Sequence, residues 1–333
     1  MSFLYLLANK AQHDGLSIKA QGQLDALKRH YHSVKFLHLA TMGLFSFHIK
    51  AVYISIKSQH IFFRYNPKVP FLVLWLSLLS WFKPVFFEHN ILLYKELPYL
   101  KRYGELWMHS ALLIGMSFGR IIHICASDEI AKDLKKRGLD NTTFVHNGYA
   151  LPDLSCQKKE DVTIQKVIQF KKGKLAVFTG NGYDWHGLDR VLNLIEQYPF
   201  LQLLVIGPYP NTPHPQVMYT GAVNQATLYA LYEFADFAIS TFAWDRIGTT
   251  QGTPLKSREY LCHGLPILVN YEDGASTMPA LSDYVFSYQK DNLALEKLLC
   301  FSYDKSQLIQ KARQQLSWDE VWKDTVLKNI TSH

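Results

Sequence analysis

The sequence predicts an α/β protein built from two doubly wound domains. Three observations indicate this class: a length of 333 residues, a hydrophobic content of 48%, and an alternation of apolar strands and helical segments that occurs twice along the chain. Because a domain usually contains about 100 to 200 residues, two domains are expected. Strands that alternate with helices favour parallel sheets that are covered by helices on both faces.

The first domain is predicted over residues 1–153 and the second over 175–304. Strands of the first are expected at 3–8, 34–39, 60–65, 84–87, 121–126 and 143–146. The charged, polar stretch 154–174 is predicted to be a linker. Strands of the second are expected at 175–180, 201–207, 236–240 and 265–270, and helices are expected over 305–333.

The apolar run PFLVLWLSLLSWFKPVFF, residues 70–87, raises the question of a membrane span. A transmembrane helix needs about 18 or more apolar residues, and Pro70, Lys83 and Pro84 interrupt this run. A helix over 71–82 followed by a strand is therefore favoured. The N-terminus does not resemble a signal peptide and the four cysteines are scattered, so a reducing cytoplasm is the expected location.

Charge is distributed unevenly along the chain. Residues 1–160 contain 20 Lys and Arg against 11 Asp and Glu, whereas residues 161–333 contain 15 against 17. The front half is also rich in aromatic residues, including Trp75 and Trp81. A basic, aromatic surface favours an anionic membrane surface or a nucleic acid as partner. No recognition module for nucleic acid is evident, so the membrane is the preferred candidate.

The segment TPLKSREYLCHGLPILV, residues 253–269, predicts a short helix that leads into a buried strand. Thr253 is expected to cap this helix and Pro254 to occupy its first turn. Lys256 and Arg258 place two cations where the helix N-terminus is already partly positive, an arrangement that an anion would stabilise. The preceding loop adds Gly252 and several threonine hydroxyls, so a phosphate site is predicted. Alternatively, the cations are solvated and Lys256 pairs with Glu259.

The sequence resembles the retaining nucleotide-sugar glycosyltransferases of family 4. The matching segments are ICASDEIAKDLKKRGLDNTTFVHNGYAL (124–151), LAVFTGNGYDWHGLDRVLNLIEQYPFLQLLVIG (175–207), YTGAVNQATLYALYEFADFAIS (219–240), PLKSREYLCHGLPIL (254–268) and SWDEVWKDTVLKNI (317–330). The resemblance implies the GT-B fold, in which two Rossmann-like domains face each other across a cleft. It also implies that the C-terminal helices cross back to the first domain.

The resemblance implies roles for particular residues. Glu259 would accept hydrogen bonds from the ribose hydroxyls of the donor, and Lys256 would lie near its diphosphate. His89, in FFEHN, would contact the transferred sugar. Gly15 would stand at the start of the first helix, where the backbone approaches the substrates closely. Thr253, Gly252 and Arg258 would complete the donor site.

Three departures from the family pattern fall within the same donor site. Gln251 stands where many members have a glutamate that faces the donor sugar, and Asn181 and His186 stand where many have an arginine and a lysine. Lys256, Arg258 and Arg246 would then compensate for the two missing cations. Two hypotheses follow: a transferase with a rewired site, which is favoured, and a catalytically silent protein that binds sugar nucleotides or acts as a membrane-associated partner.

The function that the resemblance implies is retaining, metal-independent transfer of a sugar from a nucleoside-diphosphate sugar of the UDP or GDP type. The departing diphosphate would be stabilised by the cations and the helix N–H groups, so neither a metal nor another cofactor is expected. The acceptor would be a saccharide or lipid-linked saccharide of a bacterial-type surface polysaccharide or glycolipid. The location would be cytoplasmic, with peripheral attachment to the inner face of the membrane as a candidate. No GxSxG, P-loop or HExxH motif is present.

Overall fold

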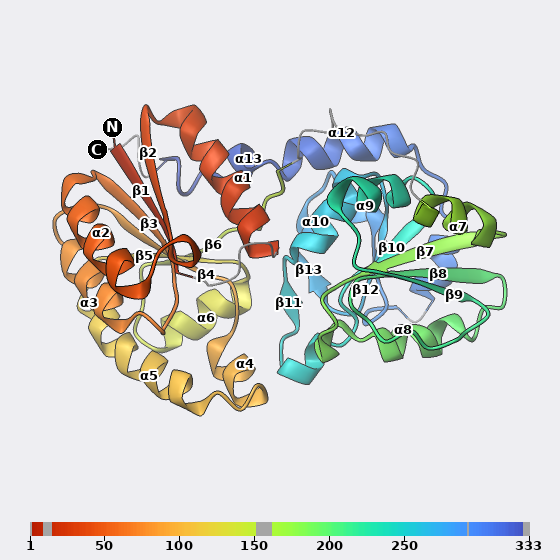
Figure 1. The fold of residues 1–333 in the computed structure, drawn as a ribbon, viewed down its shortest axis with the longest axis horizontal. Coiled ribbons are helices and arrows are strands. Elements are labelled where there is room, and N and C mark those ends of the chain that lie inside the picture. Colours follow the sequence, from red (N-terminus) through yellow and green to blue (C-terminus); the bar gives the residue numbers. More distant parts are fainter. Residues whose placement is uncertain (1, 9–14, 151–161, 292, 329–333) are drawn as a thin grey trace. The chain divides into compact units, whose positions relative to one another are not determined.

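The computed structural model describes residues 2–8, 15–150, 162–291 and 293–328. The chain divides into two compact units (Figure 1). Unit 1 comprises Met1–Ala150 together with Ser317–His333, and unit 2 comprises Leu151–Leu316. The final helical segment predicted over 305–333 is thus shared, because α12 (Lys305–Gln315) belongs to unit 2 and α13 (Trp318–Trp322) to unit 1.

Unit 1 contains a six-stranded parallel sheet with the order β2-β1-β3-β4-β5-β6. The strands are β1 (Ser2–Leu7), β2 (Ser33–His38), β3 (His60–Arg64), β4 (Val85–His89), β5 (Ile122–Cys125) and β6 (Thr142–Phe144). The α-helices within residues 1–150 are α1 (Gly15–His30), α2 (Leu44–Lys57), α3 (Pro70–Leu79), α4 (Leu93–Tyr99), α5 (Tyr103–Ser117) and α6 (Asp128–Lys136). All six strands predicted for the first domain are confirmed, with ends that differ by at most two residues.

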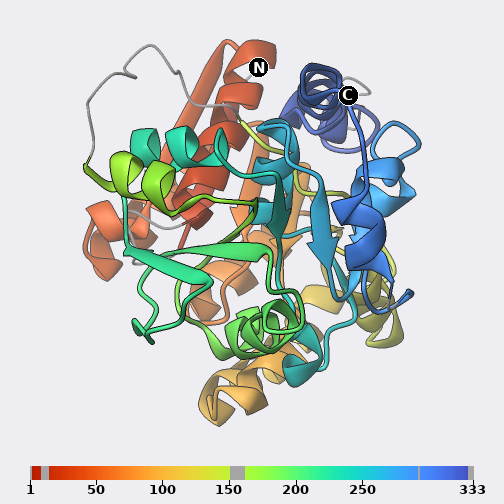
Figure 2. The same cartoon turned by 90° about the vertical axis from the view of Figure 1, so that its right-hand side faces the viewer.

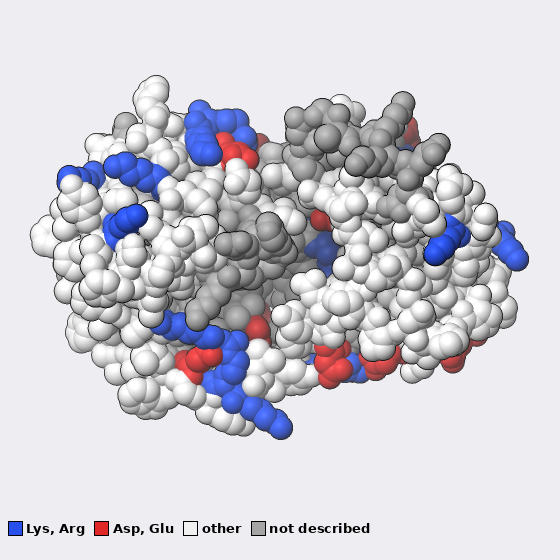
Figure 3. Space-filling view, in the orientation of Figure 1, with Lys and Arg blue, Asp and Glu red and all other residues white. Residues whose placement is uncertain are grey.

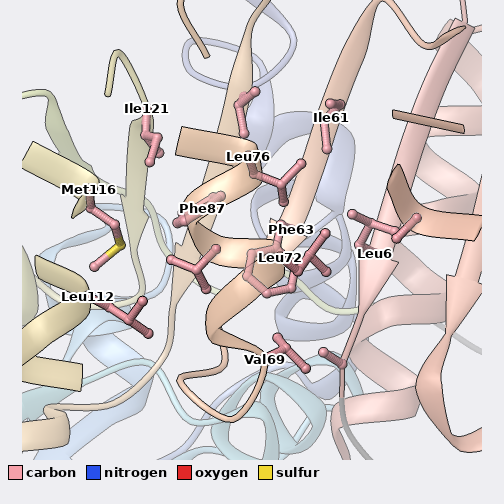
Figure 4. Close-up of a cluster of buried hydrophobic side chains, with 14 of the residues drawn as sticks. Leu6, Ile61, Phe63, Val69, Leu72, Leu76, Phe87, Leu112, Met116 and Ile121 are labelled. Atoms are coloured by element: carbon pink, nitrogen blue, oxygen red, sulfur yellow. The ribbon is translucent and has the colours of Figure 1, made fainter. Parts of the chain in front are cut away.

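Side chains alternate between the two faces of this sheet and build two cores. On one face, Leu6, Phe63 and Phe87 pack with residues of α2, α3 and α5 (Figure 4). On the other face, Tyr5 and Phe62 pack with residues of α1 and of the C-terminal segment. Both faces are covered, which is why the strands read as nearly continuous apolar runs.

The run 70–87 forms a helix and then a strand, as predicted. Leu72 and Leu76 of α3 point into the core (Figure 4). Phe71 and Leu78 of the same helix are exposed. No helix in the described part of the chain is both long and apolar enough to cross a membrane. One side of α3 is therefore buried and the other exposed, although nearly all of its residues are apolar.

The C-terminal segment closes the second face of the unit 1 sheet. Trp318 and Trp322 are buried against α1 and the strands, and the Trp322 ring lies 5.3 Å from the ring of Phe62. Gly22, in the middle of α1, permits this close packing. A Cβ atom there would lie 2.7 Å from Nε1 of Trp318 and 2.6 Å from the Cβ of Ala150.

Unit 2 has its own six-stranded parallel sheet with the order β14-β12-β10-β7-β8-β9. The strands are β7 (Lys174–Thr179), β8 (Leu201–Ile206), β9 (Val217–Gly221), β10 (Phe237–Ile239), β12 (Ile267–Val269) and β14 (Val285–Ser287); β11 (Gln251–Gly252) and β13 (Glu272–Asp273) form a separate pair. The four strands predicted for the second domain are present, whereas β9 and β14 were not predicted. This order is that of a Rossmann fold, with the chain reversing direction between β7 and β10.

Helices cover both faces of the unit 2 sheet, with α7 and α9 on one side and α8 on the other (Figures 1 and 2). They are α7 (Val162–Phe170), α8 (Leu188–Ile195), α9 (Gln225–Tyr232), α10 (Leu255–Cys262) and α11 (Ala294–Leu299). Helix α7 falls within the stretch 154–174 for which the sequence predicted a linker, and 154–161 lie outside the described residues. Val167 of α7 is fully buried, so this helix packs as part of unit 2.

Replacing Trp322 by alanine tests the contribution of the C-terminal segment to unit 1. Trp322→Ala should lower the free energy of unfolding by about 3 to 5 kcal/mol, because it opens a large void beneath Phe62. Denaturant unfolding measures the change, with Phe118→Ala as the control because that side chain is 72% exposed. Equal stability of the two variants would contradict the assignment of this segment to the core.

Candidate functional site

Helix α10 is held against the carboxyl end of β7. The hydroxyl of Tyr260, in α10, accepts a hydrogen bond from the Thr179 backbone N–H at 2.9 Å and lies 2.7 Å from the Thr179 hydroxyl. The residue that caps α10 is Pro254, with extended backbone angles (φ −64°, ψ 143°), and not Thr253 as predicted. The helix starts one residue later than expected, at Leu255, and its first turn lies at the point where the Rossmann order reverses.

Lys256 lies in the first turn of α10 and points towards the end of β7. Lys256 is half-buried as a residue, and its ammonium donates a hydrogen bond to the Thr179 carbonyl at 3.1 Å and lies 5.3 Å from the centre of the Phe178 ring. Burial lowers the pKa of Lys256 from 10.5 to about 7. A lysine in this state gains its full charge when an anion binds beside it.

His186 lies next to Lys256 in the loop that follows β7. Burial, together with the charge of Lys256, lowers the pKa of His186 to about 2, so this side chain is neutral. Its Nδ1 atom lies 2.9 Å from the Tyr209 hydroxyl. Both groups crowd Gly180, where a Cβ atom would lie 2.1 Å from that hydroxyl. The next residue, Asn181, is exposed in the same loop.

Glu259 lies one turn after Lys256 on α10. Its Oε1 atom accepts a hydrogen bond from the hydroxyl of Tyr232, a buried residue of α9, at 2.5 Å. The carboxylate is half-buried and its orientation is fixed by this contact. Glu259 can therefore accept hydrogen bonds from hydroxyl groups placed beside the N-terminal part of α10.

Arg258, which the sequence analysis placed in the donor site, is paired with an acid in this structure. The side chain is fully buried, and Nη1 donates to Oδ1 of Asp273 at 2.6 Å. Arg246, the other cation expected to compensate, pairs with the carboxylates of Asp184 and Asp189. Of the three cations expected in the donor site, Arg258 and Arg246 are paired with carboxylates. The ammonium of Lys256 forms no ion pair with a carboxylate of the described residues.

Gln251, Gly252 and Thr253 lead into α10. The Gln251 amide donates to Oε2 of Glu272 at 2.6 Å, across the pairing of β11 with β13. Gly252 packs closely under Trp244, and Thr253 is buried. Gln251 stands where many members of the resembled family carry a glutamate, and here its amide is hydrogen-bonded to the carboxylate of Glu272.

In unit 1, His89 is the last residue of β4 and is buried. Its Nε2 lies 3.0 Å from Nδ1 of His123, and its ring centre lies 4.9 Å from that of Tyr65. Burial and the neighbouring His123 and His109 hold the pKa of His89 well below its usual range. His89 is therefore a neutral hydrogen-bonding group and not a cation.

A buried charged cluster in unit 1 contains Lys19, which the sequence analysis did not single out, together with Glu88 and Arg64. The ammonium of Lys19, in α1, lies 2.9 Å from Oε1 of Glu88 and also donates to Asn90 and Asn147. Burial lowers the pKa of Lys19 to about 8, although the Glu88 carboxylate acts in the opposite direction. Burial would raise the pKa of Glu88, but Lys19 and Arg64 together lower it to about 2. The signal was a lysine on the core-facing side of α1, beside Ala20 and Leu24.

The structure brings Lys256, Glu259 and His186 together at one edge of the unit 2 sheet. His89 and Gly15, the first residue of α1, belong to unit 1. In the described ranges, no three His, Cys, Asp or Glu side chains gather in a way that could hold a metal ion. The chemistry of the unit 2 edge is that of an anion site with a carboxylate one helical turn away.

Neither protein-family models nor curated protein sequences match this sequence. Solved structures match along its whole length. Anabaena HepE in complex with UDP is 13% identical, with a TM-score of 0.66 and full coverage of both chains. Sucrose-phosphate synthase from Thermosynechococcus elongatus is 13% identical, with a TM-score of 0.66, covering 100% of this chain and 98% of that one.

A third solved structure matches with a lower score. The UDP-GlcNAc 2-epimerase from Neisseria meningitidis bound to UDP-GlcNAc is 13% identical, with a TM-score of 0.51 and full coverage of both chains. At these identities the likeness defines the fold. With its two parallel, Rossmann-like sheets, the chain has the GT-B fold predicted from the sequence.

The low pKa of Lys256 predicts a proton-linked binding reaction. In the protein without ligand the pKa of Lys256 is about 7, so above pH 7 its side chain is mostly neutral. A bound diphosphate favours the charged ammonium, so the complex holds a proton that the unliganded protein lacks. Titration calorimetry with UDP at about pH 8.5, in buffers of different ionisation enthalpy, should show uptake of up to about one proton. Lys256→Met should abolish this uptake. An unchanged uptake in Lys256→Met would assign it to another group.

Proposed function

We propose that this protein is a glycosyltransferase that moves a sugar from a nucleoside-diphosphate sugar to a saccharide or lipid-linked saccharide acceptor. Transfer retains the anomeric configuration and requires no metal ion. The product belongs to a bacterial-type surface polysaccharide or glycolipid, made at the cytoplasmic face of a membrane. The observation that carries the proposal is the placement of Lys256 and Glu259 on one face of α10, at the end of β7.

The charges of the site support this function. The ammonium of Lys256 lies at the end of β7 beside the first turn of α10, where the ammonium and the partial positive charge of the helix N-terminus would stabilise the negative charge of a departing diphosphate. The diphosphate itself would then take the proton of the attacking acceptor hydroxyl. We assign Glu259 to the ribose hydroxyls and the neutral His89 to a hydrogen bond with the transferred sugar.

The departures at Asn181, His186 and Gln251 favour a second candidate, a silent protein that binds a sugar nucleotide without transferring it. His186 is neutral and Asn181 carries no charge, so two cations common in the resembled family are lacking. Against this candidate, the Glu272 carboxylate is bonded to Gln251, so an acidic group remains beside the donor site. Donor turnover separates the two candidates, and conversion of the donor without an acceptor would indicate an epimerase instead.

Glu259→Gln tests the ribose assignment. Loss of the carboxylate should weaken UDP or GDP, whichever binds, by about tenfold or more, as expected for a hydrogen bond to a charged group. The 2′,3′-dideoxy analogue should lose much less. The control is Glu196→Gln, whose carboxylate is largely exposed on the same unit. Equal losses for the ribonucleotide and its analogue would remove Glu259 from the ribose site.

Turnover without metal tests the mechanism. With a donor that turns over, activity should persist in excess chelator, because Lys256 and the helix N–H groups supply the positive charge. Lys256→Ala should lower kcat/KM by about ten- to a hundredfold, whereas Lys297→Ala, at an exposed pair with Asp291, should not. The anomeric configuration of the product is read by NMR. Activity that is lost in chelator and restored by Mg²⁺ or Mn²⁺ would refute this mechanism.

A further inference from the structure

Three neighbouring helices of unit 1 expose an apolar face. On the side opposite to the core of Figure 4, α2, α3 and α5, with the residues that follow α3 and α5, carry large side chains that are mostly more than half exposed. These residues, called here the apolar face, are Leu44, Phe45, Ile49, Tyr53, Ile56, Phe71, Leu74, Leu78, Trp81, Phe82, Tyr103, Trp107, Ile114 and Phe118. Phe45 is 80% and Phe82 84% exposed. Scattered apolar residues are ordinary on a surface, but a gathering of this size marks an interaction site.

The face follows the helical period and is held together by packing. On α2, Phe45, Ile49 and Tyr53 recur every four residues, which places them on one side of the helix. Helices α2, α3 and α5 lie side by side over one face of the sheet (Figure 1). The Lys83 ammonium ties the end of α3 to α2, because it donates to the carbonyls of Ser55, Ile56 and Ser58 at 2.7 to 3.0 Å. The exposed residues therefore form one fixed surface.

Cations accompany the face, and acids are almost absent from it. Between Asp25 and Glu88 the sequence contains no Asp or Glu and eight Lys or Arg, of which Lys28 and Arg29 belong to α1 on the other face of the sheet and Arg64 is buried beside Glu88. Four of the remaining cations are exposed: Lys35, Lys50, Lys57 and Lys68. Figure 3 shows basic side chains in separate groups on unit 1, with largely uncharged surface between them. The acid near the start of α5, Glu105, is paired with Arg102 and Lys68. A surface of this charge suits an anionic partner.

Two cations lie against aromatic rings of the face. The Lys57 ammonium lies 4.1 Å from the centre of the Tyr53 ring, and the Arg120 guanidinium lies 4.3 Å from that of Trp81. Aromatic residues with a polar edge, flanked by long cationic side chains, are typical of the boundary between lipid headgroups and acyl chains. A second copy of the chain would bring cations against cations, which disfavours self-association through this face.

We propose that the apolar face inserts into the headgroup region of a membrane that contains anionic lipids. The proposal rests on the proposed function in one respect, the lipid-linked acceptor, and adds the surface and its mode of attachment. Phe45, Phe82, Trp107 and Phe118 enter the boundary with the acyl chains, and the neighbouring Lys and Arg side chains contact lipid phosphates. Trp75, which the sequence suggested for such a surface, is partly buried and donates to the Ser55 hydroxyl at 3.0 Å.

Vesicle flotation with the full chain tests the proposal. Vesicles of about 30% phosphatidylglycerol in phosphatidylcholine should bind the protein, and raising NaCl from about 0.1 to 0.5 M should weaken binding only a few-fold, since apolar contacts are not screened. Phe45→Ser/Phe82→Ser/Phe118→Ser should lower the partition coefficient at least about tenfold. The matched control, Val162→Ser/Phe200→Ser, changes exposed apolar residues of unit 2 and should bind as the parent does.

Complete release at high salt, or equal binding by both variants, would overturn insertion through this face. A dimer that the triple variant abolishes, in a protein that ignores vesicles, would assign the face to a second copy instead. UDP binding by each variant is measured in parallel and verifies that unit 2 is intact. A protein that binds UDP but no vesicles would refute the docking proposal and leave the transferase proposal standing. A protein that binds vesicles but turns over no donor would refute the transferase proposal and leave the docking proposal standing.

Discussion

The orientation of α10 depends on the buried ion pair between Arg258 and Asp273. Asp273 accepts from the guanidinium at 2.6 Å, from the backbone N–H of Ala275 at 2.8 Å and from the Tyr271 hydroxyl at 2.6 Å. The Tyr271 hydroxyl in turn lies 2.8 Å from that of Ser257 on α10. Removal of one partner of such a pair leaves an uncompensated buried charge, at a cost of about 3 to 5 kcal/mol. Lys256 and Glu259 flank this anchor, so the pair sets where both side chains point.

The sequence was sufficient to predict the unit 1 sheet and four of the six strands of the unit 2 sheet, and insufficient to separate the two cations of α10. Strands such as β1 and β8 are buried on both faces and are therefore almost entirely apolar, which makes them recognisable. Strand β9 has mostly half-buried residues and lacks such a run. Lys256 and Arg258 both looked like phosphate ligands because their position in the first turn was known. The partner of Arg258, Asp273, lies beyond the next strand, and no local pattern connects them.

The two faces of the unit 1 sheet show why composition alone was ambiguous. Aromatic residues are abundant in the front half, and they serve both as core, as Phe63 and Phe87 do, and as exposed surface, as Phe45 and Phe82 do. Whether an aromatic side chain of a helix is buried or exposed depends on which side of the helix faces the sheet. The position of the sheet is therefore needed before the side chain can be assigned. Trp75 and Trp81 lie six residues apart and face differently for this reason.

The departures from the family pattern acquire a physical meaning from the charges around the end of β7. Arg258 and Arg246 are paired with acids, His186 is neutral, and burial holds the pKa of Lys256 near 7. The unit thus folds without a cluster of repelling cations at this edge. An arginine at position 181 and a lysine at position 186 would add two charges beside Lys256 and lower its pKa further. With Asn181 and His186 in their place, the positive charge at the end of β7 is concentrated on Lys256, and above pH 7 a bound anion would favour its charged form.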